Sequence, residues 1–372
     1  MLYKRIVVKF GTNLLTGGTD HLNQEIMTGL AKQIARLHNE GQEIVIVSSG
    51  AVAAGRQKLG LRKKRKDIPF KQVLASVGQN QLMQIYDRIF SKHKITIAQA
   101  LLTKSDLSNR AGYLNARNTL LALIELGVIC IINENDVVAT EEIRGIRFGD
   151  NDNLSAMVAN LIDADLLVLL TDIDGLYTAD PHHDPNAKLI SQVKKIDNRI
   201  KRLANGAAGV RGVGGMTTKI EAAKLATTCG INVVIANGLK PDILRQVVLG
   251  NKIGTFFTAL PNKMESKKRW ILSGLASKGR LLIDDGAALA LRKQNKSLLP
   301  AGITSLEGKF QRGDIVDIFY TTNNRLGCGI SNYSSDEILA IKGADSRSVA
   351  SILGYEYGSE VIHRNNMVIE IE

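Results

Sequence analysis

Short apolar runs alternate with amphipathic stretches through residues 5–259 of this chain. The runs are rich in Val, Ile and Leu with little polar alternation, which is typical of strands covered on both faces. Strands are predicted at 6–10, 43–47, 95–101, 128–132, 166–170 and 232–236, and helices at 24–39, 79–92, 114–126, 154–163 and 218–229. This alternation predicts an α/β fold, a mainly parallel sheet sandwiched between helices.

The pattern changes after Phe256 and Phe257. A polar, basic stretch follows, and beyond it short strand-like runs at 280–283, 315–320, 326–330 and 367–371 alternate with glycine-containing turns. We therefore expect a first domain at 1–260, a linker at 261–275 and a small β-rich domain at 276–372. A length of 372 residues suits two domains.

Small carboxylates and amides gather in two clusters between residues 133 and 155. Glu134 and Asp136 follow an apolar run, at the strand end where open α/β sheets bind ligands. Asp150 and Asp152 precede a helical pattern, and a helix N-terminus is a natural anion site. Turns and helix caps use the same residue types, so either cluster alone also fits that interpretation. Two clusters so close together favour a binding site.

The net charge of +12 lies outside the C-terminal part, since residues 276–372 carry 11 Lys and Arg against 12 Asp and Glu. Part of the excess is the basic run at 62–66, which we interpret as a solvated loop. No apolar run approaches the ~18 residues of a membrane span. Cys130, Cys229 and Cys328 are widely separated, so neither a disulfide framework nor a zinc site is indicated, and a reducing cytoplasm is expected.

Two lysines accompany glycine-rich segments. Lys9 lies near the end of the first predicted strand, and Lys219 is the last residue of the glycine-rich segment 209–219, in the first turn of a predicted helix. The helix dipole disfavours a cation there unless an anion compensates it. For Lys9, the alternative is a lysine that extends to solvent. With the carboxylates, the pair fits a phosphoryl-transfer site, although no Walker or Rossmann motif occurs.

None of the six histidines lies in these segments, so no general base is indicated. A hydroxyl acceptor usually needs a base, whereas a carboxylate with a pKa near ~4.3 is already ionised at neutral pH. This favours a kinase that phosphorylates a carboxylate and produces an acyl phosphate.

An ordered set of motifs carries a family resemblance. They are V-K-F-G-T-N at 8–13, S-S-G-A-V-A-A-G at 48–55, N-E-N-D at 133–136, F-G-D-N-D-N-L-S-A at 148–156, L-L-T-D-I-D-G-L-Y-T-A-D-P at 169–181 and G-G-M-T-T-K at 214–219. Together they resemble the glutamate 5-kinase family of the amino acid kinase superfamily. The tail, with D-D-G-A-A-L-A at 284–290, S-L-L-P-A-G-I at 297–303 and R-G-D at 312–314, resembles a PUA domain.

The resemblance implies ATP-dependent phosphorylation of the L-glutamate side-chain carboxylate to glutamyl 5-phosphate, the first step of proline biosynthesis. Lys9 and Lys219 would neutralise the transferring phosphoryl group, and Asp152 would hold them in place. The expected glutamate-binding residues are Ser49, Asp136 and Asn151. The expected ATP-binding residues are Lys9, Thr171, Asp172, Val213, Gly214, Gly215, Met216, Thr217, Thr218 and Lys219. Mg²⁺ is expected on the nucleotide phosphates and not in a protein metal site.

One segment departs from the family pattern. Val210 and Val213 replace a glycine and a threonine of its nucleotide loop, so Val213 offers only its backbone amide. The family also implies a homo-oligomer, a dimer or tetramer, and proline as a feedback inhibitor.

Two alternatives stay open at this point. The first is a related kinase acting on acetylglutamate or aspartate. The second is an RNA-binding protein acting through the C-terminal domain, although RNA is not the expected partner because the charge there is nearly balanced.

Overall fold

The computed structural model describes residues 2–61, 67–139, 151–181, 183–205, 215–260, 277–321 and 324–369. The chain forms two compact units. The first comprises Met1–Leu107 and Thr119–Lys263, and the second comprises Ser108–Asn118 and Met264–Glu372.

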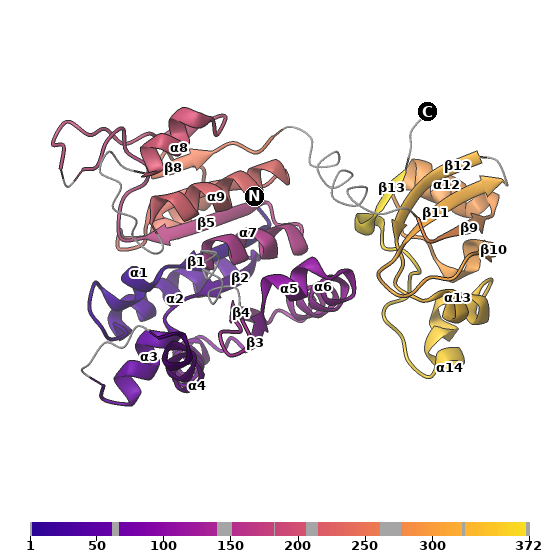
Figure 1. Cartoon of the computed structure of the whole chain (residues 1–372), viewed down its shortest axis with the longest axis horizontal. Helices are drawn as coiled ribbons and strands as arrows, with labels where there is room; N and C mark the ends of the chain where they lie inside the picture. Colours follow the sequence, from indigo (N-terminus) through magenta and orange to yellow (C-terminus); the bar gives the residue numbers. More distant parts are fainter. Residues whose placement is uncertain are drawn as a thin grey trace. The chain divides into compact units, whose positions relative to one another are not determined.

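A mostly parallel sheet organises the first unit (Figure 1). In the described residues it has eight strands in the order β3-β4-β2-β1-β5-β7-β8-β6. Only the β7–β8 pair among these is antiparallel. The strands are β1 (Arg5–Phe10), β2 (Glu43–Ser48), β3 (Ile97–Leu102), β4 (Ile129–Glu134), β5 (Leu166–Thr171), β6 (Gln192–Val193), β7 (Asn232–Asn237) and β8 (Thr255–Phe257). The predicted α/β sandwich is confirmed.

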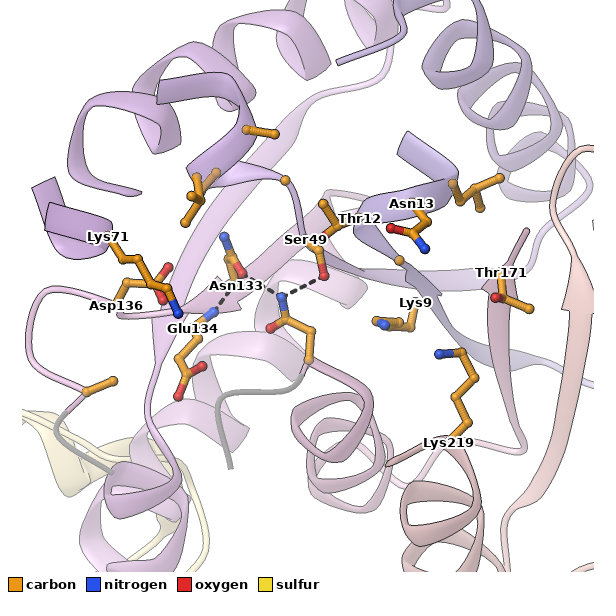
Figure 2. A pocket seen from close by; sticks show the side chains of 18 of the residues that line it. Lys9, Thr12, Asn13, Ser49, Lys71, Asn133, Glu134, Asp136, Thr171 and Lys219 are labelled. Atoms are coloured by element: carbon orange, nitrogen blue, oxygen red, sulfur yellow. Dashed lines mark hydrogen bonds between the residues drawn. The ribbon is translucent and has the colours of Figure 1, made fainter. Parts of the chain in front are cut away.

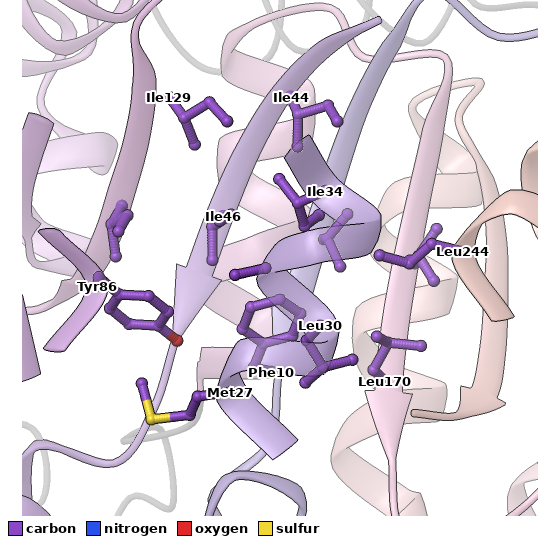
Figure 3. Close-up of a cluster of buried hydrophobic side chains, with 14 of the residues drawn as sticks. Phe10, Met27, Leu30, Ile34, Ile44, Ile46, Tyr86, Ile129, Leu170 and Leu244 are labelled. Carbon is purple, nitrogen blue, oxygen red and sulfur yellow. The ribbon is translucent and has the colours of Figure 1, made fainter. Parts of the chain in front are cut away.

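The helices that contact strands of this sheet include α1 (Thr12–Thr16), α2 (Gln24–Asn39), α4 (Ile68–Ser91), α7 (Asn151–Leu161), α9 (Met216–Thr228) and α10 (Ile243–Val248). The same stretch of the chain also forms α3 (Ala51–Lys58), α5 (Lys104–Ser108), α6 (Arg110–Glu125) and α8 (Asn198–Asn205). Ile6, Val8 and Phe10 of β1 join side chains of α2 and α4 in one apolar core (Figure 3). Because side chains alternate along a strand, Val7 and Lys9 point to the other face.

All six predicted strands of this unit are present, with ends shifted by up to two residues. The predicted start of α4 at Gln79 was wrong, since the helix begins at Ile68. There the Asp67 side chain accepts a hydrogen bond from the Phe70 amide, and Pro69 occupies the first turn, which is a favoured helix start. Helix α3 was not predicted. Gly50 precedes it with a φ of 102°, a conformation suited to glycine.

The second unit contains a five-stranded sheet within the described residues, in the order β10-β9-β11-β12-β13. Its strands are β9 (Gly279–Ile283), β10 (Ile303–Glu307), β11 (Ile315–Thr321), β12 (Asn324–Ile330) and β13 (Met367–Ile369), and its helices include α12 (Asp285–Gln294), α13 (Ser335–Ile341) and α14 (Val349–Leu353). Strand β10 and these helices were not predicted, but the small β-rich domain is confirmed. In the described parts of both units, no helix is long and apolar enough to cross a membrane.

Candidate functional site

A cavity of about 340 Å³ opens at the carboxyl ends of β1, β2, β4 and β5 (Figure 2). The residues that line it are Lys9, Gly11, Thr12, Asn13, Leu14, Ser49, Gly50, Ala51, Val52, Ala53, Ile68, Lys71, Gln72, Asn133, Glu134, Asp136, Ala139, Asn151, Thr171, Asp172 and Lys219. These four strands lie side by side in the order β4-β2-β1-β5. The groups that follow each strand therefore line up in the same order along the cavity.

Asp152 joins two lysines at the centre of the site. The Lys9 Nζ lies 2.5 Å from Asp152 Oδ1, and the Lys219 Nζ lies 3.3 Å from Asp152 Oδ2. The Thr218 hydroxyl donates to the same Oδ2 at 2.8 Å. Asp152 is 0% exposed, and the lysines are 3% and 6% exposed. The structure thus brings Asp152 into contact with both lysines that the sequence analysis paired with it.

The fold explains why these residues meet. Lys9 is the penultimate residue of β1 and faces away from the core that contains Phe10. Asp152 lies in the first turn of α7, and Lys219 lies in the first turn of α9. Because α7 packs against both β1 and α9, the three charged groups converge at one point.

Opposing effects act on the Asp152 carboxyl. Burial raises its pKa, but the charges of Lys9 and Lys219 and the hydrogen bond from Thr218 outweigh that effect, so the pKa is lowered below its ordinary value. Asp152 is therefore ionised at neutral pH. Both lysines share this one buried carboxylate.

An amide cluster lies beside this charged group, where β2 and β4 end. The Asn151 Nδ2 donates to Asn133 Oδ1 at 2.9 Å, to Ser49 Oγ at 3.0 Å and to the Ser48 carbonyl at 3.3 Å. Asn133 Oδ1 also accepts from the Glu134 amide at 2.9 Å. Ser49 and Asn151, both predicted to bind substrate, are thus brought into contact.

Asp136 and Lys71 lie close together away from the two central lysines (Figure 2). The Gln72 Nε2 donates to the Asp136 carbonyl at 3.0 Å, which ties the segment after β4 to helix α4. The cavity therefore has an acidic and a basic side chain at this end. Both charges of an amino acid would find a partner there.

Thr171 is the last residue of β5 and Asp172 follows it, on the side of Lys9 opposite to β2. The Thr171 hydroxyl donates to Asp172 Oδ1 at 2.9 Å, and the Asn13 Nδ2 lies 3.4 Å from Asp172 Oδ2. Of the segment predicted to bind nucleotide, Lys219 lines the described cavity and Thr218 contacts Asp152.

The other predicted nucleotide residues have different positions. Gly215 caps α9, and Met216 is the first residue of that helix. The Thr217 hydroxyl donates to the Ala204 carbonyl at 3.3 Å. Val213 and Gly214, with Val210, lie outside the described residues.

Several lining residues were missed by the sequence predictions. Thr12 and Asn13 belong to the glycine-containing segment after β1, so that motif could have suggested them. Lys71 and Gln72 lie in the first two turns of α4, where no helix was predicted. The sequence offered no local signal for them.

Histidine and cysteine side chains are absent from the lining in the part of the chain that the structure describes. Cys130 and Cys328 are buried, whereas Cys229 is only partly buried. Burial raises the pKa of the Cys130 thiol to about 12. Across the described ranges, no group of three or more His, Cys, Asp and Glu residues could hold a metal ion.

The sequence profile of the amino acid kinase family matches residues 4–237, and that of the PUA domain matches residues 279–353. The chain is 58% identical to a glutamate 5-kinase of Dehalococcoides mccartyi over 99% of this chain and 98% of that protein. It is 50% identical to a glutamate 5-kinase of Herpetosiphon aurantiacus over the same shares. A UMP kinase structure from Bacillus anthracis, 19% identical, has a TM-score of 0.47 and covers 69% of this chain and 96% of its own.

Proposed function

The chain belongs to the amino acid kinase family, in its glutamate 5-kinase branch, and we propose that its cavity transfers the γ-phosphoryl group of ATP to the side-chain carboxylate of L-glutamate. The product is L-glutamyl 5-phosphate, and the reaction is the first step of proline biosynthesis. The observation that carries the mechanism is the buried Lys9–Asp152–Lys219 cluster.

The strand order supports an assignment of the two ends of the cavity. Glutamate would lie over the ends of β4 and β2. There the Asp136 carboxylate would accept hydrogen bonds from its ammonium group, and Asn151 and Ser49 would provide polar contacts. ATP would lie over the ends of β1 and β5, beside Thr171 and Asp172. Adjacent strands are ~4.8 Å apart. The reacting groups would then meet above β1, where Lys9 lies next to the end of its strand.

In the proposed step, an oxygen of the substrate carboxylate attacks the γ-phosphorus. The new P–O bond forms as the bond to the β–γ bridging oxygen breaks, and ADP leaves with that electron pair. No proton has to be removed, because the acceptor is already ionised. Lys9 and Lys219 would neutralise the charge on the transferring oxygens, and Asp152 would keep both ammonium groups in place.

Mg²⁺ is proposed to accompany ATP on its phosphates. The hydroxyl and carboxylate oxygens of Thr171 and Asp172 at the proposed nucleotide end are hard donors of the kind that Mg²⁺ prefers. When bound, the ion would neutralise part of the phosphate charge. The two lysines would act on the oxygens that the ion leaves uncovered.

The proposal extends to regulation and assembly. Proline carries an ammonium and a carboxylate like glutamate, so it is expected to compete at the Asp136 end and to raise the apparent glutamate KM. The chain is expected to form a homodimer or tetramer, which light scattering would measure. Its three free cysteines fit a reducing cytoplasm.

The test uses hydroxylamine, which traps acyl phosphates as hydroxamates. We expect ATP-dependent hydroxamate with L-glutamate and far less with N-acetylglutamate or aspartate. Acetylation removes the ammonium charge, so the Asp136 carboxylate would lose its partner. Activity with N-acetylglutamate but not with glutamate would contradict the proposal.

A further inference from the structure

Helix α4 presents three polar side chains to the cavity region at intervals of seven residues. They are Gln72, Gln79 and Tyr86, and because seven residues make about two helical turns they share one face. Each contacts a different segment. Gln72 donates to the Asp136 carbonyl, Gln79 Oε1 accepts from Asn133 Nδ2 at 2.8 Å, and the Tyr86 hydroxyl lies 2.7 Å from Ser48 Oγ.

Two of these contacts converge on Asn151. Asn133, held by Gln79, accepts from the Asn151 Nδ2 through its Oδ1. Ser48, held by Tyr86, accepts from the same Nδ2 through its carbonyl. Gln79 and Tyr86 of α4 are thus linked to the side chain of Asn151, which is predicted to bind substrate. Gln79 acts through Asn133, and Tyr86 acts through Ser48.

A backbone N–H group fixes the orientation of the side-chain amides of Asn133 and Asn151. The Glu134 N–H can only donate, so the Asn133 atom beside it must be the acceptor Oδ1. Asn133 then turns its Nδ2 to Gln79, and Asn151 must turn its own Nδ2 toward Asn133. This leaves the Asn151 Oδ1 as an acceptor without a hydrogen-bond partner among the described residues.

We propose that this face of α4 positions the amino-acid end of the cavity, with Gln79 acting on Asn151 through Asn133. Gln79 does not line the cavity in the described structure, so it is a positioning residue and does not touch substrate. The inference rests on the proposed function, because it assigns the amides to the glutamate end. Fixing them before binding avoids an ordering cost when the substrate arrives.

The test is steady-state kinetics of Gln79→Met, which keeps the side-chain length and removes the acceptor. We expect the glutamate KM to rise about tenfold, with kcat and the ATP KM within about twofold of wild type. A tenfold change corresponds to about 1.4 kcal/mol, within the range for one hydrogen bond with a buried partner left unsatisfied.

Two matched variants make the test specific. Gln79→Glu restores the acceptor, and the Nε2 that it replaces has no hydrogen-bond partner among the described residues, so the glutamate KM should return to within about threefold of wild type. Gln84→Met makes the same change on the exposed side of α4, where Gln84 contacts Asn80, and should behave as wild type.

An unchanged glutamate KM in Gln79→Met would overturn the proposal, as would equal rises in both KM values or a Gln79→Glu enzyme as impaired as Gln79→Met. If Gln79→Met does not fold, Tyr86→Phe tests the second route and should raise the glutamate KM about threefold. No change in that variant would overturn the proposal as well. A wild-type enzyme that does not phosphorylate glutamate would instead contradict the proposed function.

Discussion

Lys9 and Asp152 form an ion pair of 2.5 Å that is shielded from solvent, although 142 residues separate them in the chain. A buried pair is costly to break, because removing one partner leaves an uncompensated charge. The Asp152 carboxylate also contacts the ammonium group of Lys219. The same group therefore links the stability of the fold to the chemistry of the site.

Asp152→Asn is expected to lose stability and activity together. Two buried ammonium groups would lose the carboxylate that they share, and breaking a buried pair costs about 3–5 kcal/mol. Urea denaturation measures this loss, and kcat should fall by roughly 10²–10³ as the phosphate-neutralising groups lose their position. ATP should raise the melting temperature more in the variant than in wild type, because its phosphates replace the missing charge. Equal stabilisation by ATP in both proteins would contradict this explanation.

The lowered pKa of Asp152 predicts how stability depends on pH. A carboxyl whose pKa is lower in the folded than in the unfolded protein contributes its stability above the unfolded pKa of ~3.9, and loses it as the pH falls toward the folded value. The difference in unfolding free energy between wild type and Asp152→Asn should thus be largest near pH 7 and shrink below about pH 4. A difference that stays constant down to pH 3 would contradict the ion-pair explanation.

Lys219→Ala is expected to lower kcat/KM, because it removes about 3 kcal/mol of transition-state stabilisation, by comparison with the removal of one oxyanion donor. Lys224→Ala is the matched control, since Lys224 is exposed on the same helix α9. The control should retain wild-type kinetics. Near wild-type turnover in Lys219→Ala would remove this lysine from the mechanism.

Local sequence patterns predicted the strands whose ends form the site. The apolar runs of β1, β2, β4 and β5 located the strand ends, and polar residues at those ends follow from how parallel sheets bind ligands. The motif resemblance then supplied Lys9, Asp152 and Lys219 as partners. Their distances come from the packing of α7 and α9, which no local pattern contains.

Helix α4 shows why the rest could not be predicted. Its first turns carry Lys71 and Gln72, which serve the cavity and interrupt the apolar pattern that signals a packed helix. The hydrogen bond from Asn133 to Gln79 joins residues that are 54 positions apart in the chain. Such a pair of side-chain amides leaves no periodic pattern in the sequence. A hydrogen-bonded network of this kind becomes visible only when the helix is placed against the strands.

The close crossing of α3 and α4 predicts that an alanine at Gly78 destabilises the fold, and Gly29 on α2, away from the crossing, provides the comparison. A Cβ on Gly78 would lie 1.7 Å from the Ala51 carbonyl oxygen and 2.4 Å from the Gly55 nitrogen, so Gly78→Ala must push the helices apart. We expect a loss of about 1–3 kcal/mol or more in unfolding free energy. Gly29→Ala on α2 meets nothing within 4 Å and should stabilise by about 0.5–1 kcal/mol. Thermal melting of both variants tests this, and equal effects would contradict the close crossing.

Asp136→Asn tests the direction in which glutamate lies in the cavity. The substitution keeps the backbone carbonyl that Gln72 holds and removes only the side-chain charge. A charge-assisted hydrogen bond contributes about 1.5–3 kcal/mol, so the glutamate KM should rise roughly 10- to 100-fold. The ATP KM should stay near its wild-type value, and kcat should change little, because an ammonium contact is made in the ground state and the transition state alike.

Asp87→Asn, on an exposed position of α4, is the control. If Asp136→Asn instead raised the ATP KM alone, the nucleotide would lie at the β4 end, and the order of substrates along the strand ends would have to be reversed.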